Sequence, residues 1–510
     1  RPGGPAHRGG GPHPAPRLRA GLLVGDIGGG APPPPPGGPP PGGVANLQPR
    51  EPSAMSASSI DPVPNAGRFN PITALSRGLT GLVSRYLPDP LIFAILLTII
   101  VFVLGIALTP TGPIQMVEMW GGGFWNLLGF SMQMALVLVT GHALASSDPI
   151  HRAMGWLAAF ARTPVQGVML VAFASAVACT INWGFGLVLG AMFAREVARR
   201  IPKADYRLLI ASAYIGFMTW HGGLSASVAL VAATKGNPME KTIGLIPITD
   251  TLFTNYNYFI TGALIVLLPL VCRMMHPADK DVVTIDPKLL QPEVSTRREL
   301  KPDASIAERM EESQILSWVV AALGIAYLFL YFSKQGFNIT VNTVNLMMLI
   351  AGILLHRTPM AYARAITNAA RGTAGIMIQF PFYAGIQIMM EHSGLGGLIT
   401  NLFVEIANKD NFAVLAFFSS GLVNFAVPSG GGHWVIQGPF IMPAAQALGV
   451  DLGKSAMAIA YGEEWMNMAQ PFWALPALAI AGLGVRDIMG YCATALVITL
   501  PIFLIGLYFF

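Results

Sequence analysis

Two adjacent carboxylates, Glu463 and Glu464, lie inside a long apolar stretch near the C-terminal end of the chain. Burying a carboxylate in a lipid bilayer is costly, so an ionisable pair in such a stretch marks a functional site. We expect Glu463 and Glu464 to bind a coupling ion, either H⁺ or Na⁺. The alternative is that the pair lines a water-filled vestibule. His142, His221 and His433 are candidates for proton handling or for hydrogen bonding along a cavity.

Four short segments rich in Gly, Pro and polar residues interrupt apolar stretches: 180–184, 219–225, 427–433 and 467–471. An interrupted helix exposes backbone N–H groups and the positive end of its dipole, which suit a carboxylate ligand. The alternative for each polar residue is that it only satisfies the groups at a helix end. The candidate substrate-binding residues are Thr180, Asn182, Trp183, Gly184, Thr219, Ser225, Pro428, Ser429, Gly430, Gly431, Gly432, His433, Asn467 and Gln470.

The composition places these residues in a membrane protein. Of the 510 residues, 53% are apolar and only 11% are charged, whereas a soluble domain has about 25% charged residues. Several apolar runs reach the length of about 18 residues that marks a membrane-spanning helix. Cys179, Cys272 and Cys492 all lie in apolar segments and form no CxxC pair, so we expect no disulfide, no metal site and no cofactor. The sequence has no HExxH, GxSxG or Walker motif, and we do not expect an enzyme.

The distribution of basic residues predicts the topology. Two apolar segments, 165–193 and 411–448, carry a helix-breaking turn at their centres and fit helical hairpins that enter and leave the membrane on one side. With this assignment, twenty-one of the 31 Lys and Arg residues fall on the cytoplasmic side, five fall outside and none falls in a span. This places the N-terminus in the cytoplasm and explains the net charge of +5 without a nucleic-acid partner. The predicted spans are 88–109, 124–147, 208–234, 255–275, 314–333, 344–356, 373–395, 455–481 and 487–510.

The order of spans and hairpins repeats with every direction reversed, and Ala213-Tyr214 in the first unit is echoed by Ala460-Tyr461 in the second. Inverted repeats with broken helices are typical of secondary transporters. We therefore predict an all-α polytopic membrane protein in which 148–164 and 393–410 are interfacial helices. The predicted parts are a disordered Pro/Gly-rich extension (1–67), an N-terminal repeat (68–275), a cytoplasmic linker loop (276–313), a linking span (314–343) and a C-terminal repeat (344–510).

The Pro/Gly-rich extension lacks the apolar periodicity needed to form a core. Met55 opens a normal-looking start, Met-Ser-Ala-Ser-Ser. We expect residues 1–54 to be an upstream extension, and the alternative is a disordered cytoplasmic tail.

From Arg68 to the C-terminus the chain resembles the bacterial short-chain fatty acid transporter family, of the acetoacetate and butyrate uptake type. The resemblance implies short-chain carboxylate substrates and membership of the wider ion-transporter superfamily, with paired hairpins, a homodimeric scaffold and an elevator-type motion. In the family pattern the position of His221 is usually Gly and that of Glu464 can be Gln, and Asp148 also looks like a departure, so Glu463 is the better candidate for coupling. The matching stretches are Leu87-Pro-Asp-Pro-Leu-Ile-Phe93, Ile181-Asn-Trp-Gly-Phe-Gly186, Phe425-Ala-Val-Pro-Ser-Gly-Gly-Gly-His-Trp-Val-Ile-Gln-Gly-Pro439 and Trp465-Met-Asn-Met-Ala-Gln-Pro-Phe-Trp473.

Two functions follow, both of a transporter in the bacterial inner membrane. The first is the import of short-chain monocarboxylates by cation-coupled symport, and the alternative is cation/proton antiport with Glu463 and Glu464 as the cation site. A membrane-embedded hydrolase would need a nucleophile and a base, for which Ser429 and His433 are the tempting pair. A flexible Gly-rich turn is a poor support for such a pair, so we do not favour it. We expect the substrate, the lipid bilayer and a second copy of the chain as partners.

Overall fold

The computed structural model describes residues 90–278, 281–285, 290, 303–424, 427–470 and 472–510. The predicted extension 1–67, part of the linker 276–313, and Phe425, Ala426 and Pro471 lie outside the described residues. Residues 68–510 group as one compact unit. Its described residues form helices and turns, with no strand among them.

Six helical stretches of the described residues are long and apolar enough to cross a membrane: 128–145, 164–181, 206–233, 255–274, 306–335 and 485–509. Shorter apolar helices add to these, including 94–108, 341–356 and 412–424. The chain is therefore a multi-pass membrane protein, as its composition predicts.

The elements of the first run are α2 (Pro90–Leu108), α3 (Pro113–Gly123), α4 (Leu128–Ala145), α5 (Asp148–Ala158), α6 (Pro164–Ile181), α7 (Trp183–Arg200), α8 (Tyr206–Gly216), η1 (Phe217–Gly222), α9 (Ser227–Ala233), α10 (Glu240–Ile243), η2 (Ile248–Asp250) and α11 (Asn255–Met274). The short α12 (Ile306–Glu311) and the long α13 (Gln314–Gln335) follow. The second run consists of α14 (Val341–His356), α15 (Pro359–Ala370), η5 (Arg371–Thr373), α16 (Ala374–Ser393), α17 (Leu395–Ile406), α18 (Phe412–Asn424), α19 (Gly430–Leu448), α20 (Leu452–Met466), α21 (Ala474–Ala481) and α22 (Val485–Phe509).

The helices α6 and α7 form an antiparallel hairpin, called hairpin 1 here, that turns at the single residue Asn182. A Cβ built on Gly186 would overlap the backbone of Cys179, and one built on Gly190 would lie 2.5 Å from Ser175 Oγ. Partners whose numbers rise on one helix as they fall on the other show that the two helices run in opposite directions. Glycine at these positions lets the two backbones approach closely. Hairpin 1 is thus present where the sequence predicts it, and it extends to Arg200.

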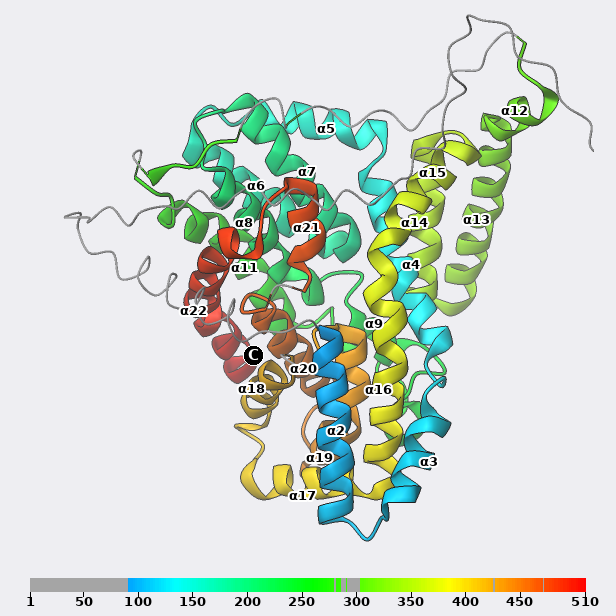
Figure 1. The fold of residues 1–510 in the computed structure, drawn as a ribbon, viewed down its shortest axis with the longest axis vertical. Helices are drawn as coiled ribbons and strands as arrows, with labels where there is room; N and C mark the ends of the chain where they lie inside the picture. The colour runs from blue at the N-terminus through cyan, green and yellow to red at the C-terminus, as the bar shows by residue number, and fades with distance from the viewer. Residues whose placement is uncertain (1–89, 279–280, 286–289, 291–302, 425–426, 471) are drawn as a thin grey trace, which may run out of the picture. The chain divides into compact units, whose positions relative to one another are not determined.

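Hairpin 2 is formed by α18 and α19 (Figure 1). The hydroxyl of Ser420 on α18 lies 2.8 Å from His433 Nε2 on α19. One turn farther from the tip, Gln437 donates from Nε2 to Ser419 Oγ at 3.1 Å. These polar contacts join the two helices next to their turn.

Each run also contains a broken helix. In the first run α8 ends at Gly216, η1 follows, and α9 begins at Ser227. In the second run α20 ends at Met466 and α21 begins at Ala474. Both interruptions include the polar segments that the sequence singles out.

The same order of elements therefore occurs twice: a helix, a short surface helix, a helical hairpin, a broken helix and a long final helix. In the first run these are α4, α5, hairpin 1, α8–α9 and α11, and in the second α16, α17, hairpin 2, α20–α21 and α22. Each run also begins with a helix that packs on the other run: α2 lies against α16, and α14 lies against α4 (Figure 1). The sequence did not predict the helices α3 and α15.

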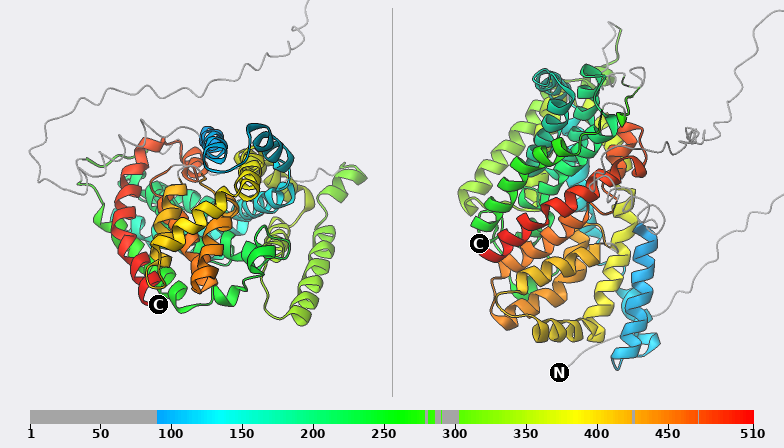
Figure 2. Two further views of the ribbon diagram at one scale, coloured as in Figure 1. Left: turned by 90° about the horizontal axis from the view of Figure 1, so that it is seen from below. Right: turned by 90° about the vertical axis from the view of Figure 1, so that its left-hand side faces the viewer.

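The helix α13 lies at the edge of the compact unit, where it packs mainly on α14 (Figure 2). Only 11% of its most apolar window is buried. Large apolar side chains such as Leu323 and Phe329 are about 70% exposed, a surface suited to lipid.

Candidate functional site

Asn182 shapes the tip of hairpin 1. Its backbone N–H ends α6 by donating to Ala178 O at 3.0 Å. Its side-chain Oδ1 accepts from the Phe185 N–H at 2.8 Å, which caps the start of α7. One residue therefore ends one helix and begins the next, which lets the chain reverse direction without a loop.

Three hydrogen bonds tie this tip to the first broken helix. The Trp183 N–H donates to Ser225 Oγ at 2.8 Å. The Leu224 N–H donates to Thr180 O at 2.7 Å, and Thr219 Oγ1 donates to Ala176 O at 2.8 Å. Thr180, Asn182, Trp183, Thr219 and Ser225, which the sequence proposes separately, thus lie together.

Gly184 brings hairpin 1 against α4. A Cβ at this position would lie 2.9 Å from Leu138 Cα and from Val137 O, which real side chains do not tolerate against backbone. This close contact requires a glycine, because no larger residue fits.

The tip of hairpin 2 packs on three other elements through its glycines. A Cβ at Gly430 would lie 2.7 Å from the imidazole of His221 and from the ring of Trp220 on η1. Gly431 faces Phe130 and Met134 of α4. The remaining glycine, Gly432, faces Tyr383 of α16, and Pro428 is buried just before the tip.

The side chain of Trp220 links the two hairpin tips. Its ring lies 5.7 Å from that of Trp183 in hairpin 1 and also next to Gly430 in hairpin 2. Residues of η1 and α4 therefore contact both hairpin tips.

The carboxylate pair lies in the second broken helix and contacts the first. Glu463 Oε2 lies 3.1 Å from His221 Nε2, and Glu464 Oε2 accepts the backbone N–H of His221. All three side chains are at most 1% exposed. A single residue of η1 therefore contacts both carboxylates and the tip of hairpin 2.

An amide network surrounds Glu463. Asn467 donates from Nδ2 to Glu463 Oε1 at 3.2 Å, and Gln470 donates from Nε2 to Asn467 Oδ1 at 2.6 Å. Asn424 of α18 donates from Nδ2 both to Asn467 Oδ1 and to Glu463 O at 3.2 Å. Tyr214 of α8 donates to Asn467 O at 2.9 Å, which links the two broken helices.

His433 lies inside hairpin 2 and not beside Ser429. Its Nε2 lies 2.6 Å from Gln437 Oε1 and 2.8 Å from Ser420 Oγ. Ser429 Oγ instead accepts the Gly432 N–H at 3.4 Å and caps α19. These partners give no support to a nucleophile–base pair.

The site is polar but has no basic side chain in it. Among the described residues, no Lys or Arg side chain is buried. The same residues contain no group of three His, Cys, Asp or Glu side chains that could hold a metal ion. A negative ligand here would meet helix ends, neutral donors and the carboxyl groups of Glu463 and Glu464.

Sequence reasoning missed Asn424, Gln437, Tyr214 and Trp473. Asn424 and Gln437 are amide side chains within apolar helices, and this signal could have found them. Tyr214 was noted only as part of the repeat. Trp473 follows the break at 467–471, and the sequence does not reveal its ring contact with Trp183 of hairpin 1.

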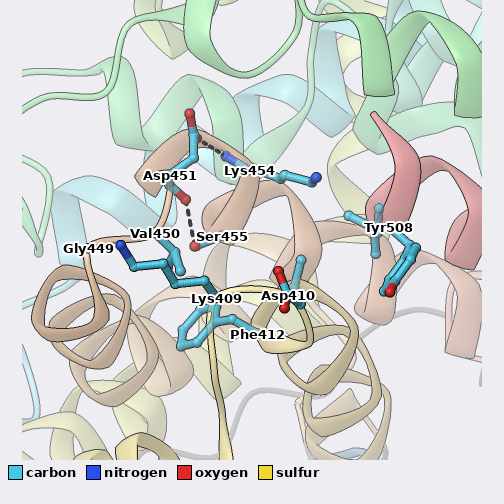
Figure 3. A pocket seen from close by; sticks show the side chains of 11 residues that line it. Lys409, Asp410, Phe412, Gly449, Val450, Asp451, Lys454, Ser455 and Tyr508 are labelled. Atoms are coloured by element: carbon cyan, nitrogen blue, oxygen red, sulfur yellow. Dashed lines mark hydrogen bonds between the residues drawn. The ribbon is translucent and has the colours of Figure 1, made fainter.

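A pocket of about 260 Å³ lies elsewhere, between the start of α18, the α19–α20 turn and the end of α22 (Figure 3). Lys409, Asp410, Asp451, Lys454 and Tyr508 line it. Partial burial lowers the pKa of Lys454, and the nearby Asp451 carboxylate opposes this shift. The pocket contains none of the residues that the sequence proposes for substrate or ion binding.

A family model described as "Short chain fatty acid transporter" matches residues 71–510. The chain belongs to the short-chain fatty acid transporter family. It is a transporter and not an enzyme, which confirms the resemblance seen in the sequence. A protein of Escherichia coli (strain K12), provisionally named a short-chain fatty acid transporter, is 69% identical over 439 residues, which cover 86% of this chain and 100% of the relative. A relative of Haemophilus influenzae (strain Rd) with the same provisional name is 62% identical over 445 residues, with the same coverage of each chain.

Two solved transporter structures have a fold similar to that of this chain. The Alcanivorax borkumensis YdaH transporter has a TM-score of 0.51 at 17% identity, over 82% of this chain and 98% of that one. Neisseria gonorrhoeae MtrF, described as one of a class of antimetabolite efflux pumps, has a TM-score of 0.50 at 14% identity, over 84% and 97%. At these identities the similarity concerns the fold alone.

Proposed function

We propose that this transporter imports short-chain monocarboxylates, such as acetoacetate and butyrate, across the bacterial inner membrane by symport with H⁺ or Na⁺. The observation that carries the proposal is the contact of Glu463 and Glu464 with His221, at the point where both broken helices meet the tip of hairpin 2. Family membership supports the substrate class.

The charges of the site favour coupling. An anionic substrate approaches a site that already holds two carboxyl groups. Among the described residues no buried Lys or Arg offsets their charge. Repulsion between like charges in a medium of low dielectric constant is strong. Binding H⁺ or Na⁺ at Glu463 removes this repulsion, so the cation and the anion bind together more readily than either alone.

Hairpin 2 provides a way to pass this signal on. Its tip rests on the imidazole that contacts Glu463. When a cation neutralises the carboxylate, the hydrogen bonding of His221 changes, and with it the surface on which Gly430 packs. We propose that hairpin 2 then closes on the substrate. In this proposal the two repeats of each chain are inverted relative to one another, the protein is a homodimer, and an elevator-type motion carries the substrate across the membrane.

The test of this function is uptake of radiolabelled butyrate into proteoliposomes. We expect an imposed inward H⁺ or Na⁺ gradient to drive butyrate accumulation above the equilibrium level. The alternative, cation/proton antiport at the same carboxylates, predicts proton movement on addition of a cation without any butyrate. Absence of butyrate uptake under both gradients would refute the proposal.

The orientation has its own test. The native cysteines Cys179, Cys272 and Cys492 are buried and are replaced by alanine. A cysteine at Ile306, which is 79% exposed on α12, should react from the cytoplasmic side, and one at Leu245, which is 45% exposed, should react from the outside. Labelling of both positions from the same side would contradict the inverted repeats.

A further inference from the structure

Three tryptophans meet where hairpin 1 and the two broken helices come together. Trp183 lies at the hairpin tip, Trp220 on η1 and Trp473 at the start of α21. The ring of Trp183 lies 5.7 Å from that of Trp220 and 5.0 Å from that of Trp473, both in edge-to-face contacts. None of the three side chains is more than 5% exposed. Three of the breaks in the helices are thus linked by one aromatic cluster.

The polar atoms of this cluster are all donors, and they have no acceptor. The indole Nε1 atoms of Trp183, Trp220 and Trp473 make no hydrogen bond, and neither does the side-chain Nδ2 of the adjacent Asn182. Most buried polar groups in proteins do have a partner. Edge-to-face ring contacts offer only weak N–H···π interactions in its place. Three unpartnered indole donors in one buried cluster, with the amide of the preceding residue Asn182 also unpartnered, call for an acceptor that binds several of them.

We propose that these indole N–H groups and the Asn182 amide bind the carboxylate of the substrate. The proposal rests on the proposed function and names the groups that recognise the anion. A carboxylate has two oxygens that accept several hydrogen bonds, and bonds to an ionised group are stronger than neutral ones. Donors on neutral side chains hold the anion without the fixed positive charge that this site lacks.

The surroundings of the cluster favour monocarboxylates with a short apolar tail. Phe217 stacks on Trp220 with ring centroids 5.3 Å apart, and Phe472 lies 4.9 Å from Trp473. An alkyl tail extending from the bound carboxylate would contact these rings. Each buried methylene should then tighten binding roughly fourfold. A second carboxylate on the tail would lie against aromatic rings without donors, so dicarboxylates should compete poorly.

The same cluster touches the coupling residues. Trp220 precedes His221, which contacts Glu463, and its ring lies beside Gly430 of hairpin 2. A substrate held by the Trp220 N–H is therefore one residue from the ion site and in contact with the tip of the second hairpin. Binding of the substrate can therefore affect both the ion site and the tip of hairpin 2.

The test replaces each indole by a ring that has no N–H. The variants Trp183→Phe, Trp220→Phe and Trp473→Phe should each raise the KM for butyrate tenfold or more, because each loses a hydrogen bond to a charged group. The Vmax of counterflow at saturating butyrate should change much less. Trp120→Phe is the matched control, since its Nε1 is also unpartnered but lies on α3 between Phe124 and Phe382. Its KM should stay that of the wild type.

A second measurement does not depend on the folding of any variant. In wild-type protein labelled with ¹⁵N-tryptophan, butyrate should shift the indole N–H resonances of Trp183, Trp220 and Trp473 and leave that of Trp120 unchanged. Two results would overturn this inference without affecting the proposed function. One is an unchanged KM for butyrate in well-folded Phe variants, and the other is the absence of a butyrate-induced shift of the indole resonances in a protein that transports butyrate. A wild-type protein that neither binds nor transports butyrate would refute the proposed function itself.

Discussion

The two hairpins occupy equivalent places in the two runs but are anchored in different ways. Hairpin 1 is bound to its broken helix by backbone groups, through Trp183 N–H to Ser225 and Leu224 N–H to Thr180. Hairpin 2 is held to its broken helix from α18, where Ser420 donates to Ile459 O and Asn424 to Glu463 O. Within the described part of the chain, the hydrogen bonds of residues 427–437 stay inside the hairpin.

This difference indicates which hairpin can move. The tip of hairpin 1 cannot leave its broken helix without losing three hydrogen bonds to backbone groups, each of which leaves a costly unpaired group. The glycines at the tip of hairpin 2 meet side chains only, so the tip can slide over them without breaking a hydrogen bond while α18 stays held to α20. We therefore expect hairpin 1 to be part of a rigid unit and hairpin 2 to act as the gate.

The largest effect should come from adding one methyl group to each hairpin. In Gly186→Ala the new Cβ overlaps the backbone of Cys179, which cannot move without opening hairpin 1. We expect a loss of about 3 kcal/mol or more in the free energy of unfolding, visible as a much lower yield of monodisperse protein and a lower Tm.

In Gly431→Ala the new Cβ meets the ends of two side chains, Phe130 Cζ at 2.9 Å and Met134 Sδ at 3.1 Å. These can shift, so the Tm should stay close to that of the wild type while butyrate uptake falls. An equal loss of folded protein in Gly431→Ala and Gly186→Ala would contradict the distinction between the hairpins.

A smaller effect should follow from removing a hydroxyl at each tip. Ser225→Ala leaves the buried Trp183 N–H without an acceptor, which should cost about 1–3 kcal/mol. Ser429→Ala removes a cap whose Oγ lies 3.4 Å from the Gly432 N–H, and a weak cap is worth only about 0.5 kcal/mol. Thermal unfolding of the purified variants measures both, and a larger loss in Ser429→Ala would reverse the assignment of the gate.

Much of this architecture could be predicted from the sequence, because membrane segments obey strict rules. Apolar length, the distribution of Lys and Arg and the Gly- and Pro-containing breaks locate both hairpins and both broken helices. Asn182 and Ser429 are polar residues that precede a helix in an apolar stretch, and both are N-caps in the structure. The carboxylates Glu463 and Glu464 are identifiable because charge is expensive there.

The contacts between distant segments could not be predicted in this way. The contact of His221 with Glu463 joins residues 242 positions apart, and Trp220 of η1 contacts both hairpin tips. The reciprocal ties of the two runs are also hidden: Tyr214 donates to Asn467 O, and Tyr461 donates to Asn257 Oδ1. Local patterns determine where a helix breaks, whereas packing determines which breaks share a site. The helices α3 and α15 were not predicted, because the segments 113–123 and 359–370 are short and mixed in polarity.

Glu463 is the residue that we propose to bind the coupling ion, and the substitution Glu463→Gln isolates this role. A glutamine keeps an oxygen that can accept from Asn467 Nδ2 but cannot bind or release a proton or neutralise Na⁺. Glu391→Gln, at an exposed carboxylate of α16, is the control and should behave as the wild type. In proteoliposomes we expect Glu463→Gln to exchange labelled for unlabelled butyrate but no longer to accumulate it when an H⁺ or Na⁺ gradient is imposed. Gradient-driven accumulation at the wild-type level in Glu463→Gln would contradict this role of Glu463.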